Sequence, residues 1–184
     1  MDVLEAIKTR RSSRAFAERG GLPLEIVDSI AQSILHSPSG SSAQESHFLI
    51  VQNEEQIKRI KRFSPGLSGD PEAIIVLCSN PAEALHKGGK DSEEVLRFVN
   101  LGIAAAYILL STHSLGIGNC PVRSFHKEAI KKMLALPHEM EPELLISLGY
   151  SKESPRKKKN REKKEVISFD RYGNTQKGEA SRTC

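Results

Sequence analysis

The segment from Glu93 to Ser114 constrains the fold of this chain more than any other. Its apolar residues recur at helical spacing, and the part from Leu101 to Leu110 is apolar almost throughout. A helix that is apolar on nearly every side has to be covered by other parts of the protein. Arg97 and Asn100 interrupt the pattern, and the clean run is about half of the ~20 residues that cross a membrane. The segment therefore predicts a buried central helix and argues against a membrane span.

Shorter segments surround this helix with further helices and with strands. Amphipathic spacing predicts helices, and apolar runs between Gly and Pro residues predict strands. The order along the chain is not a regular βαβ alternation, so we predict an α+β layer architecture. The expected helices are 3–8, 24–35, 54–63 and 127–136, and the expected strands are 47–51, 73–78 and 144–148.

Composition narrows the class of protein. The 184 residues are enough for one domain with a substantial core. The cysteines Cys78, Cys120 and Cys184 are far apart in the sequence, which argues against a disulfide scaffold or a zinc ribbon. The histidines show no metal-ligand spacing, so no metal site is expected. The charged N-terminus does not match a signal peptide, and we expect a cytoplasmic protein.

The net charge of +4 is concentrated in one segment. Residues 152–164 hold eight Lys or Arg and two Glu, so the rest of the chain is slightly acidic. A nucleic-acid-binding surface more often mixes basic residues with aromatic ones, and this run contains no aromatic residue. We expect most of these lysines to be solvated, with one or two reaching a phosphate. Nucleic-acid binding through this segment remains the alternative.

A short apolar run, Val166 to Phe169, follows the basic segment and is apolar enough to add to a sheet edge. The connector from Lys152 to Lys164 is too polar for a core, and a dozen extended residues span ~40 Å. We therefore predict that the connector leaves its own subunit and that Val166 to Phe169 pairs as a strand with a sheet, that of a partner subunit.

A dense group of anion-binding donors follows the first predicted helix. Arg10, Arg11, Ser12, Ser13 and Arg14 stand together. Arginine offers planar, paired donors that suit a phosphate. The same residues could instead be a basic helix end that complements the helix dipole. The residues alone leave both interpretations open.

Four segments, in order, resemble the FMN-dependent nitroreductase family over about residues 3 to 172. Any one of the four is weak, but together they are fairly specific. They are Arg10 to Phe16, similar to the family's Arg-x-Ser-x-Arg-x-Phe; Ser37 to Gln44, similar to its Pro-Ser-x-x-Asn-x-Gln loop; Gly102 to Ala104 with Leu115 to Gly118, similar to its central helix and Gly-Leu-Gly exit; and Leu148 to Tyr150 with Arg171 to Gly173, similar to its C-terminal end.

The resemblance implies a three-layer sandwich of α+β class. A mostly antiparallel central sheet is flanked by helices, and a C-terminal extension is exchanged between subunits. The FMN-binding domain would span residues 1–172, and residues 173–184 would be a flexible polar tail. The resemblance further implies a homodimer with FMN at the interface. NAD(P)H would reduce the flavin, and a small quinone or nitroaromatic acceptor would then take the electrons. An FMN-carrying or regulatory protein with little turnover is the alternative within this fold.

The resemblance also implies site residues near the phosphate. Arg10 and Arg14 would hold it, Ser12 would bond the phosphate or the ribityl chain, and Arg11 would lie near the pyrimidine edge of the flavin. The late basic residues Lys159 and Arg161 would close on the phosphate.

Further residues would contact the flavin ring, some of them from the partner subunit. They are Pro38, Ser39, Ser42, Gln44 and the backbone around Pro121 and Val122. The flavin carries the chemistry, so no catalytic side chain is assigned.

The chain departs from the family pattern at several positions. Ser42 replaces the family's Asn, Glu45 and Ser46 replace its Pro-Trp, and Asn100 replaces its frequent Asp before the helix glycine. The stretch from Phe63 to Glu93 is short for the region that often covers the flavin. These departures concern the identity of the substrate more than FMN binding.

Overall fold

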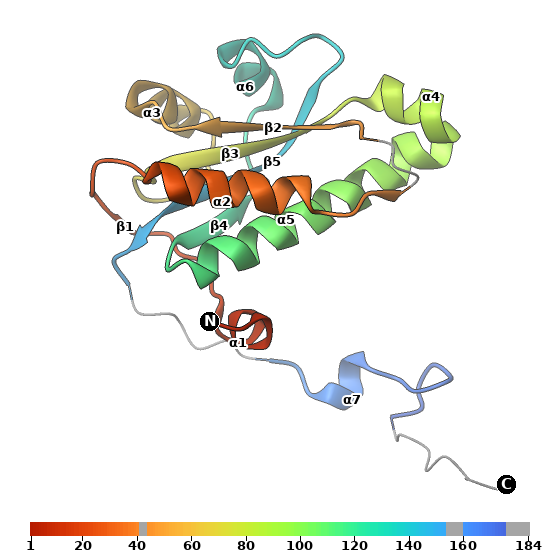
Figure 1. Cartoon of the computed structure of the whole chain (residues 1–184). Helices are drawn as coiled ribbons and strands as arrows, with labels where there is room; N and C mark the ends of the chain where they lie inside the picture. Colours follow the sequence, from red (N-terminus) through yellow and green to blue (C-terminus); the bar gives the residue numbers. More distant parts are fainter. Residues whose placement is uncertain (41–43, 154–159, 176–184) are drawn as a thin grey trace, which may run out of the picture.

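An antiparallel sheet forms the middle of the molecule (Figure 1). The computed structural model describes residues 1–40, 44–153 and 160–175, and within these ranges the sheet has five strands. Strand β3 lies between β2 and β5, while β1 and β4 also pair with β5. The strands are β1 Phe16–Ala17, β2 Ser46–Val51, β3 Ala73–Ser79, β4 Gly118–Val122 and β5 Glu141–Ser151.

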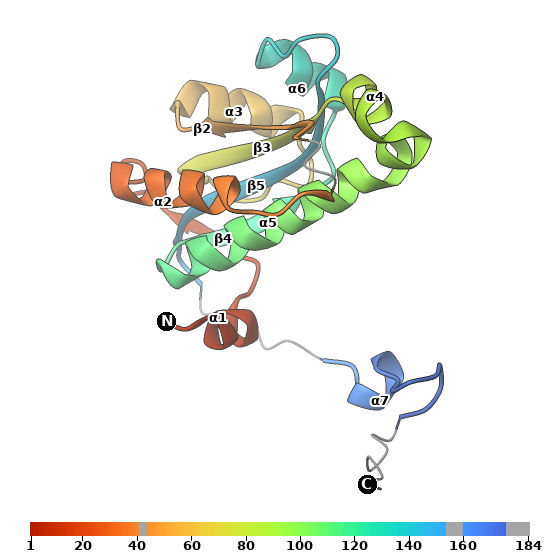
Figure 2. The ribbon, with the colours of Figure 1, turned by 45° about the vertical axis from the view of Figure 1, so that its right-hand side comes forward.

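Helices cover both faces of the sheet (Figures 1 and 2). Helices α2 and α5 pack on one face, and α3 and α6 pack on the other. The helices are α1 Val3–Thr9, α2 Leu24–Leu35, α3 Glu54–Arg62, α4 Pro81–Asp91, the π-helix η2 Ser92–Leu96, α5 Arg97–Ser114, α6 Lys127–Met133 and α7 Lys163–Val166. The expected α+β fold, with an antiparallel sheet between helices, is confirmed.

The sequence of strand β3 is a continuous apolar run because helices cover both faces of the sheet. Ile75 and Leu77 belong to the core beside α2 and α5, whereas Ile74 and Val76 belong to the core beside α3 and α6. Side chains alternate along a strand, so helices on both faces require apolar residues at every position. Every residue of β3 is buried accordingly.

Local capping sets where several helices begin. The side chains of Asp2, Asn53 and Asn80 each accept a hydrogen bond from a backbone N–H in the first turn of α1, α3 and α4. Such caps satisfy donors that have no partner inside the helix. Pro81 then occupies the start of α4, where a missing N–H costs nothing.

The long helical stretch from Pro81 to Ser114 is not straight. Gly89 adopts a φ of 69°, which interrupts α4, and η2 then leads into α5. By length and composition this stretch could cross a membrane, a test that core helices also pass. Here Leu101 and Ile108 are buried against the sheet and α2. The stretch is therefore the central helix of the fold, as predicted over 93–114.

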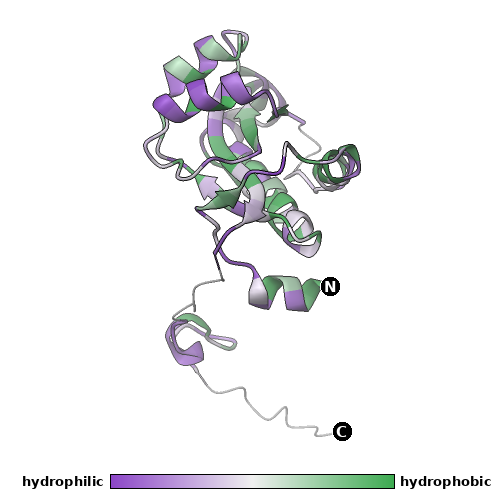
Figure 3. Cartoon of the chain, turned by 90° about the vertical axis from the view of Figure 1, so that its left-hand side faces the viewer, coloured by the Kyte–Doolittle hydropathy of each residue, from purple (hydrophilic) through white to green (hydrophobic). Residues whose placement is uncertain are grey.

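One side of this helix stays uncovered within the described part of the chain. Val95, at the end of η2, and Phe98, Val99 and Tyr107 of α5 are each exposed by 41% or more. They recur at helical spacing and form what we call the apolar stripe of α5. Helix α1 is also apolar on its outside, as the green residues near the N-terminus in Figure 3 show.

The other predicted elements agree with the structure in type, with shifted ends. Helix α2 matches 24–35, while α6 ends at Met133 and β5 extends to Glu141 and Ser151. Helix α4 and strand β4 were not expected from the sequence. Strand β4 carries Gly118 and Pro121, which are poor strand formers, and its pairing with β5 outweighs that preference.

Val166, the first residue of the predicted strand over Val166 to Phe169, is helical in this structure, whereas pairing of the following residues with a partner's sheet remains a prediction. Val166 ends α7, and no strand includes residues 167–169 in the described part of the chain. The cause is local, because the backbone N–H of Glu162 donates to the Glu165 carboxylate at 2.9 Å and starts a helical turn. The proposed exchange of this extension between subunits remains a prediction.

Candidate functional site

The donor-rich segment that follows α1 lies along β4. Ser12 pairs with Asn119 in a parallel bridge, and the Ser13 N–H donates to the Asn119 carbonyl at 2.9 Å. Arg10 Nη1 approaches Asn119 Oδ1 at 3.4 Å. The structure therefore places Arg10 and Ser12 beside a sheet strand.

Asn119 anchors this segment, and sequence reasoning missed it. Its side chain is 1% exposed and donates to the Leu109 carbonyl and to Thr112 Oγ1, both at 2.9 Å. One buried amide thus joins β4, the donor-rich segment and the end of α5. Nothing in the local sequence Gly-Asn-Cys-Pro marks the residue for this role, because its partners come from other elements.

Two glycines let the donor-rich segment lie close to strand β4. Gly116 has a φ of 79° and its N–H donates to the His113 carbonyl at 3.0 Å, which ends α5. A Cβ on Gly118 would lie 2.7 Å from Ser13 Oγ, so only glycine lets the two segments meet here. The Gly116-x-Gly118 pair is therefore a helix-ending turn, as predicted, and also a contact point.

A cavity of about 240 Å³ opens at this junction. Arg11, Ser12, Ser13, His113 and Gly118 are among the residues that line it. Its wall thus combines a guanidinium, two hydroxyls, an imidazole and the carboxylate of Glu153 with the glycine-rich turn. This donor set suits an anion such as a phosphate.

His113, in the wall of this cavity, senses the charges of Arg10 and Arg11. Partial burial lowers the pKa of His113, and the nearby charges of Arg10 and Arg11 lower it further. Within the described residues, the ion pairs include none of Arg10, Arg11 or Arg14. A bound anion would offset this local excess of positive charge.

The three arginines differ in their surroundings. Arg11 Nη1 donates to the carbonyls of Lys8 at 2.8 Å and Arg10 at 2.6 Å, so it caps the end of α1. The alternative interpretation as a helix-end residue therefore holds for Arg11 in this structure. Arg14 is exposed at the start of β1.

The second predicted segment, from Pro38 to Gln44, lies at the other end of α5. The Gly40 N–H donates to Asn100 Oδ1 at 2.9 Å, which ties the segment to the first turns of α5. Pro38, Ser39 and Gln44 are exposed, and Ser42 lies outside the described residues.

Asn100 and His113 are thirteen residues apart on α5, which corresponds to about 20 Å along the helix axis. One chain therefore does not bring the Arg10 and Pro38 segments to the same place.

Pro121 and Val122 continue β4 beyond the donor-rich segment. Pro121 is exposed, and Val122 is buried in the core beside α3 and α6. The absence of an N–H at Pro121 is tolerated because β4 pairs on only one side along this stretch. The predicted ring-contacting backbone thus lies two residues from Asn119, on the same strand.

A buried carboxylate holds the far end of β4, and sequence reasoning also missed it. Glu143 is 3% exposed and pairs with Arg97 at 2.7 Å, with Lys127 at 2.5 Å and with Arg123 at 3.7 Å. Arg97 also donates to Ser79 Oγ at 2.7 Å. This network fixes the starts of α5 and α6 to the sheet.

The late basic residues do not reach this site within the chain. Arg161 Nη2 donates to the Glu165 carbonyl at 2.9 Å, and α7 stands away from the sheet and its covering helices (Figures 1 and 2). Lys159 lies outside the described residues.

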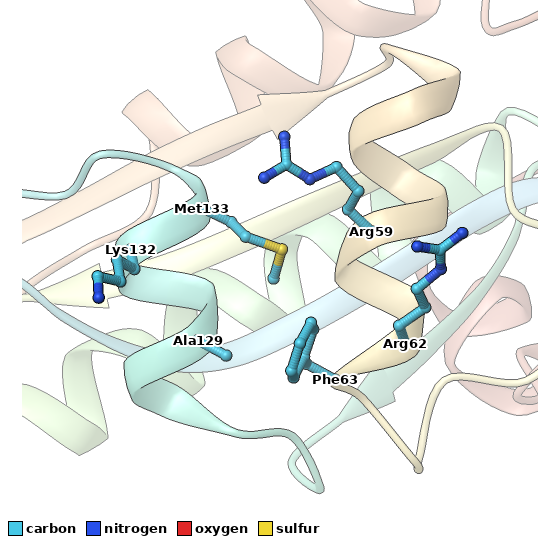
Figure 4. A pocket seen from close by; sticks show the side chains of 6 residues that line it. All are labelled: Arg59, Arg62, Phe63, Ala129, Lys132 and Met133. Carbon is cyan, nitrogen blue, oxygen red and sulfur yellow. The ribbon is translucent and has the colours of Figure 1, made fainter.

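A second cavity, of about 340 Å³, lies between α3 and α6 on the other face of the sheet. Figure 4 shows Met133 and Phe63 between the two helices, with Arg59 above Met133. None of the predicted site residues lines it. We therefore take the junction of β4, α5 and the donor-rich segment as the candidate site.

Comparisons with known proteins find relatives of this chain in sequence and in fold. A family model described as "Nitroreductase family" matches residues 7–67 and 62–150. A protein of Methanothermobacter thermautotrophicus, provisionally named NADH dehydrogenase/NAD(P)H nitroreductase, is 34% identical over 163 residues, which cover 84% of this chain and 80% of that protein.

Solved structures share the fold. A nitroreductase family protein of Clostridium difficile is 20% identical with a TM-score of 0.82, and the match covers 93% of this chain and 99% of that one. A structure from the same species, described as an FMN-dependent nitroreductase, is 23% identical with a TM-score of 0.77, over 92% of this chain and 99% of that one.

Proposed function

The chain belongs to the nitroreductase family, and we propose that it is an FMN-dependent oxidoreductase. It would take electrons from NAD(P)H and pass them to a small organic acceptor of quinone or nitroaromatic type. The observation that carries this proposal is the donor-rich segment fixed along β4 at the end of α5. Arg10, Ser12 and Ser13 lie there beside a cavity that His113 lines, and the charges of Arg10 and Arg11 lower the pKa of His113.

The residues at this junction fit the phosphate of FMN. The hydroxyls of Ser12 and Ser13 lie at the cavity, and Arg10 and the exposed Arg14 stand next to them in the sequence. Charge-assisted hydrogen bonds of this kind contribute about 1.5–3 kcal/mol each. Arg11 lines the cavity, but its Nη1 donates to two backbone carbonyls, whereas the contact of Arg10 with Asn119 is long, at 3.4 Å. We therefore assign the phosphate to Arg10 and Arg14.

Strand β4 would orient the ring. Its edge beyond Asn119 leads to the backbone of Pro121 and Val122, which we assign to the reacting side of the flavin. When bound, FMN supplies the redox chemistry, since it accepts a hydride from NAD(P)H and releases the electrons to a second acceptor. The protein then has to bind and orient the cofactor, and no side chain is needed as a proton donor.

We further propose a homodimer with two equivalent sites. The Arg10 and Pro38 segments lie at opposite ends of α5, so a second copy is needed to bring a Pro38 segment to each Arg10 segment. The apolar stripe of α5 and the exposed Val3, Leu4 and Ile7 of α1 supply a surface that such a partner could cover. Lys159 and Arg161 would reach the phosphate from the C-terminal extension.

The absorbance spectrum of the purified protein tests this function. We expect flavin bands in the protein as isolated or after incubation with FMN, and bleaching of these bands by NADH or NADPH without oxygen. Reoxidation by added quinone or nitroaromatic compound would then identify the acceptor class. A protein that binds no FMN contradicts the proposal. A protein that binds FMN but turns over slowly would be a flavin carrier.

A further inference from the structure

A buried amide connects both ends of the segment that precedes β2. Asn100 is 4% exposed, and its Oδ1 accepts from the Gly40 N–H at 2.9 Å. Its Nδ2 donates to Glu45 Oε1, also at 2.9 Å. One side chain on α5 therefore fixes the residues on either side of 41–43. The Asn100 amide thus accepts one hydrogen bond through Oδ1 and donates another through Nδ2.

Burial of the Glu45 carboxyl group, the partner of Asn100, costs folding free energy. Glu45 is 2% exposed, and its Oε2 has no hydrogen-bond partner in the described residues. Its backbone carbonyl accepts from the Asn80 N–H at 2.8 Å, which ties it to the end of β3. Gln44, next to it, has a φ of 49°, which is uncommon for a residue with a side chain. Such costs persist only where the surroundings hold the backbone in place.

We propose that Asn100 and Glu45 are positioning residues: by holding Gly40 and Glu45 on α5, they place Pro38, Ser39 and Gln44 for contact with the flavin. This inference rests on the proposed function. The pair is matched in its hydrogen bonding, because an aspartate at position 100 would set two carboxylates against each other at the present 2.9 Å contact.

The test exchanges the hydrogen-bond donor and acceptor between positions 100 and 45. Asn100→Asp keeps the acceptor for the Gly40 N–H but replaces the donor that faces Glu45. Glu45→Gln keeps a carbonyl acceptor for Asn100 Nδ2. In the double variant, the introduced amide of Glu45→Gln can donate to the introduced carboxylate. The readouts are the FMN dissociation constant, from quenching of flavin fluorescence, and hydrogen exchange of the Gly40 amide in the protein without FMN.

We expect Asn100→Asp to weaken FMN binding about tenfold or more, which corresponds to about 1.4 kcal/mol, and to expose the Gly40 amide to exchange. Glu45→Gln should change the affinity by no more than about twofold. The double variant should recover both readouts. Asn80→Asp is the matched control, since its side chain only accepts from the Glu83 N–H and aspartate caps helices as well as asparagine.

Two results would overturn the inference. One is an Asn100→Asp protein with normal FMN affinity and a protected Gly40 amide. The other is a double variant no better than Asn100→Asp, including the case in which neither protein folds. If Asn100→Asp alone fails to fold while the double variant folds, the rescue supports the pairing. If the wild type binds no FMN, the proposed function fails, and Gly40 exchange still decides whether the pair fixes the segment.

Discussion

At the scale of single residues, the phosphate assignment depends on Arg10 and Arg14. Replacing either by alanine removes a charged donor, and we expect FMN binding to weaken about tenfold or more, since such contacts contribute roughly 1.5–3 kcal/mol. Titration of each variant with FMN measures this. Arg59→Ala is the control, because Arg59 lies at the cavity between α3 and α6. If both single variants bind FMN like the wild type, the phosphate lies elsewhere.

His113 reports on the same charges. Burial and the neighbouring Arg10 and Arg11 lower its pKa in the folded protein below the usual value of 6.5. The unfolded chain therefore binds the proton more readily, so this residue reduces stability as the pH falls through about 6.5 and below. We expect His113→Gln to flatten the decline of the melting temperature below this pH.

A second prediction about His113 concerns the change of its pKa when an anion binds. Bound inorganic phosphate or FMN would offset the arginine charges and raise the pKa of His113, which NMR titration of the ring protons can follow. Arg10→Ala should raise it without any anion. A pKa that responds to neither change would show that the anion does not bind next to this ring.

The residues that sequence could predict are those that stand together in one segment. Arg10 and Ser12 belong to one short motif, and the structure places them side by side. Asn119 and Glu143 could not be found this way. Their contacts join residues of separate elements, such as Asn119 with Leu109 and Glu143 with Arg97. Such pairs leave no fixed spacing in the sequence.

At the scale of elements, the spacing of apolar residues predicted helices and strands best where one face of the element, or the whole element, is buried. Helix α2 and strand β3 follow this rule. Strand β4 does not, because its conformation comes from pairing with β5 rather than from its own residues. Val166 shows the opposite case, because the turn of Glu162 and Glu165 makes it helical despite its preference for strands.

Helix α5 gives the sharpest test of the interface. Ile108, near its middle, is fully buried in the core, so an aspartate there would unfold the subunit rather than test the dimer. Val99 is 48% exposed and belongs to the apolar stripe. We expect Val99→Asp to give a folded monomer that has lost FMN, measured by sedimentation and flavin absorbance. Phe63→Asp, at 46% exposure between α3 and α6, should stay dimeric. A dimeric, flavin-loaded Val99→Asp protein would exclude this face.

At the scale of the whole molecule, a shared site makes a prediction about mixed dimers. Arg10→Ala damages the segment beside β4, and Ser39→Trp blocks the segment at the other end of α5. Each homodimer should bind FMN poorly. If each site takes one segment from each subunit, a mixed dimer has one site with both defects and one intact site. Refolding the two variants together should therefore restore FMN binding to a fraction of the sites. No restoration would place both segments of a site in one chain.

The C-terminal extension is a second part of the chain that we expect to stabilise the dimer. In the described residues, α7 forms no ladder with the sheet, and Val166 and Ile167 are exposed by 56% and 44%. Apolar residues that find no cover in their own chain gain stability by packing on a second one. We expect truncation after Ser151 to weaken both dimerisation and FMN binding, measured by sedimentation and by FMN titration.

The matched control neutralises charge without shortening the chain. Changing Lys157, Lys158, Lys163 and Lys164 to glutamine should cost little, because solvated charges are individually weak. The comparison separates two roles of the extension. If truncation leaves a stable dimer with normal FMN affinity, the extension is a solvated tail and the phosphate is held by the Arg10 segment alone. If truncation removes FMN while the lysine variant keeps it, the extension contributes through its path and through Lys159 or Arg161, rather than through its net charge.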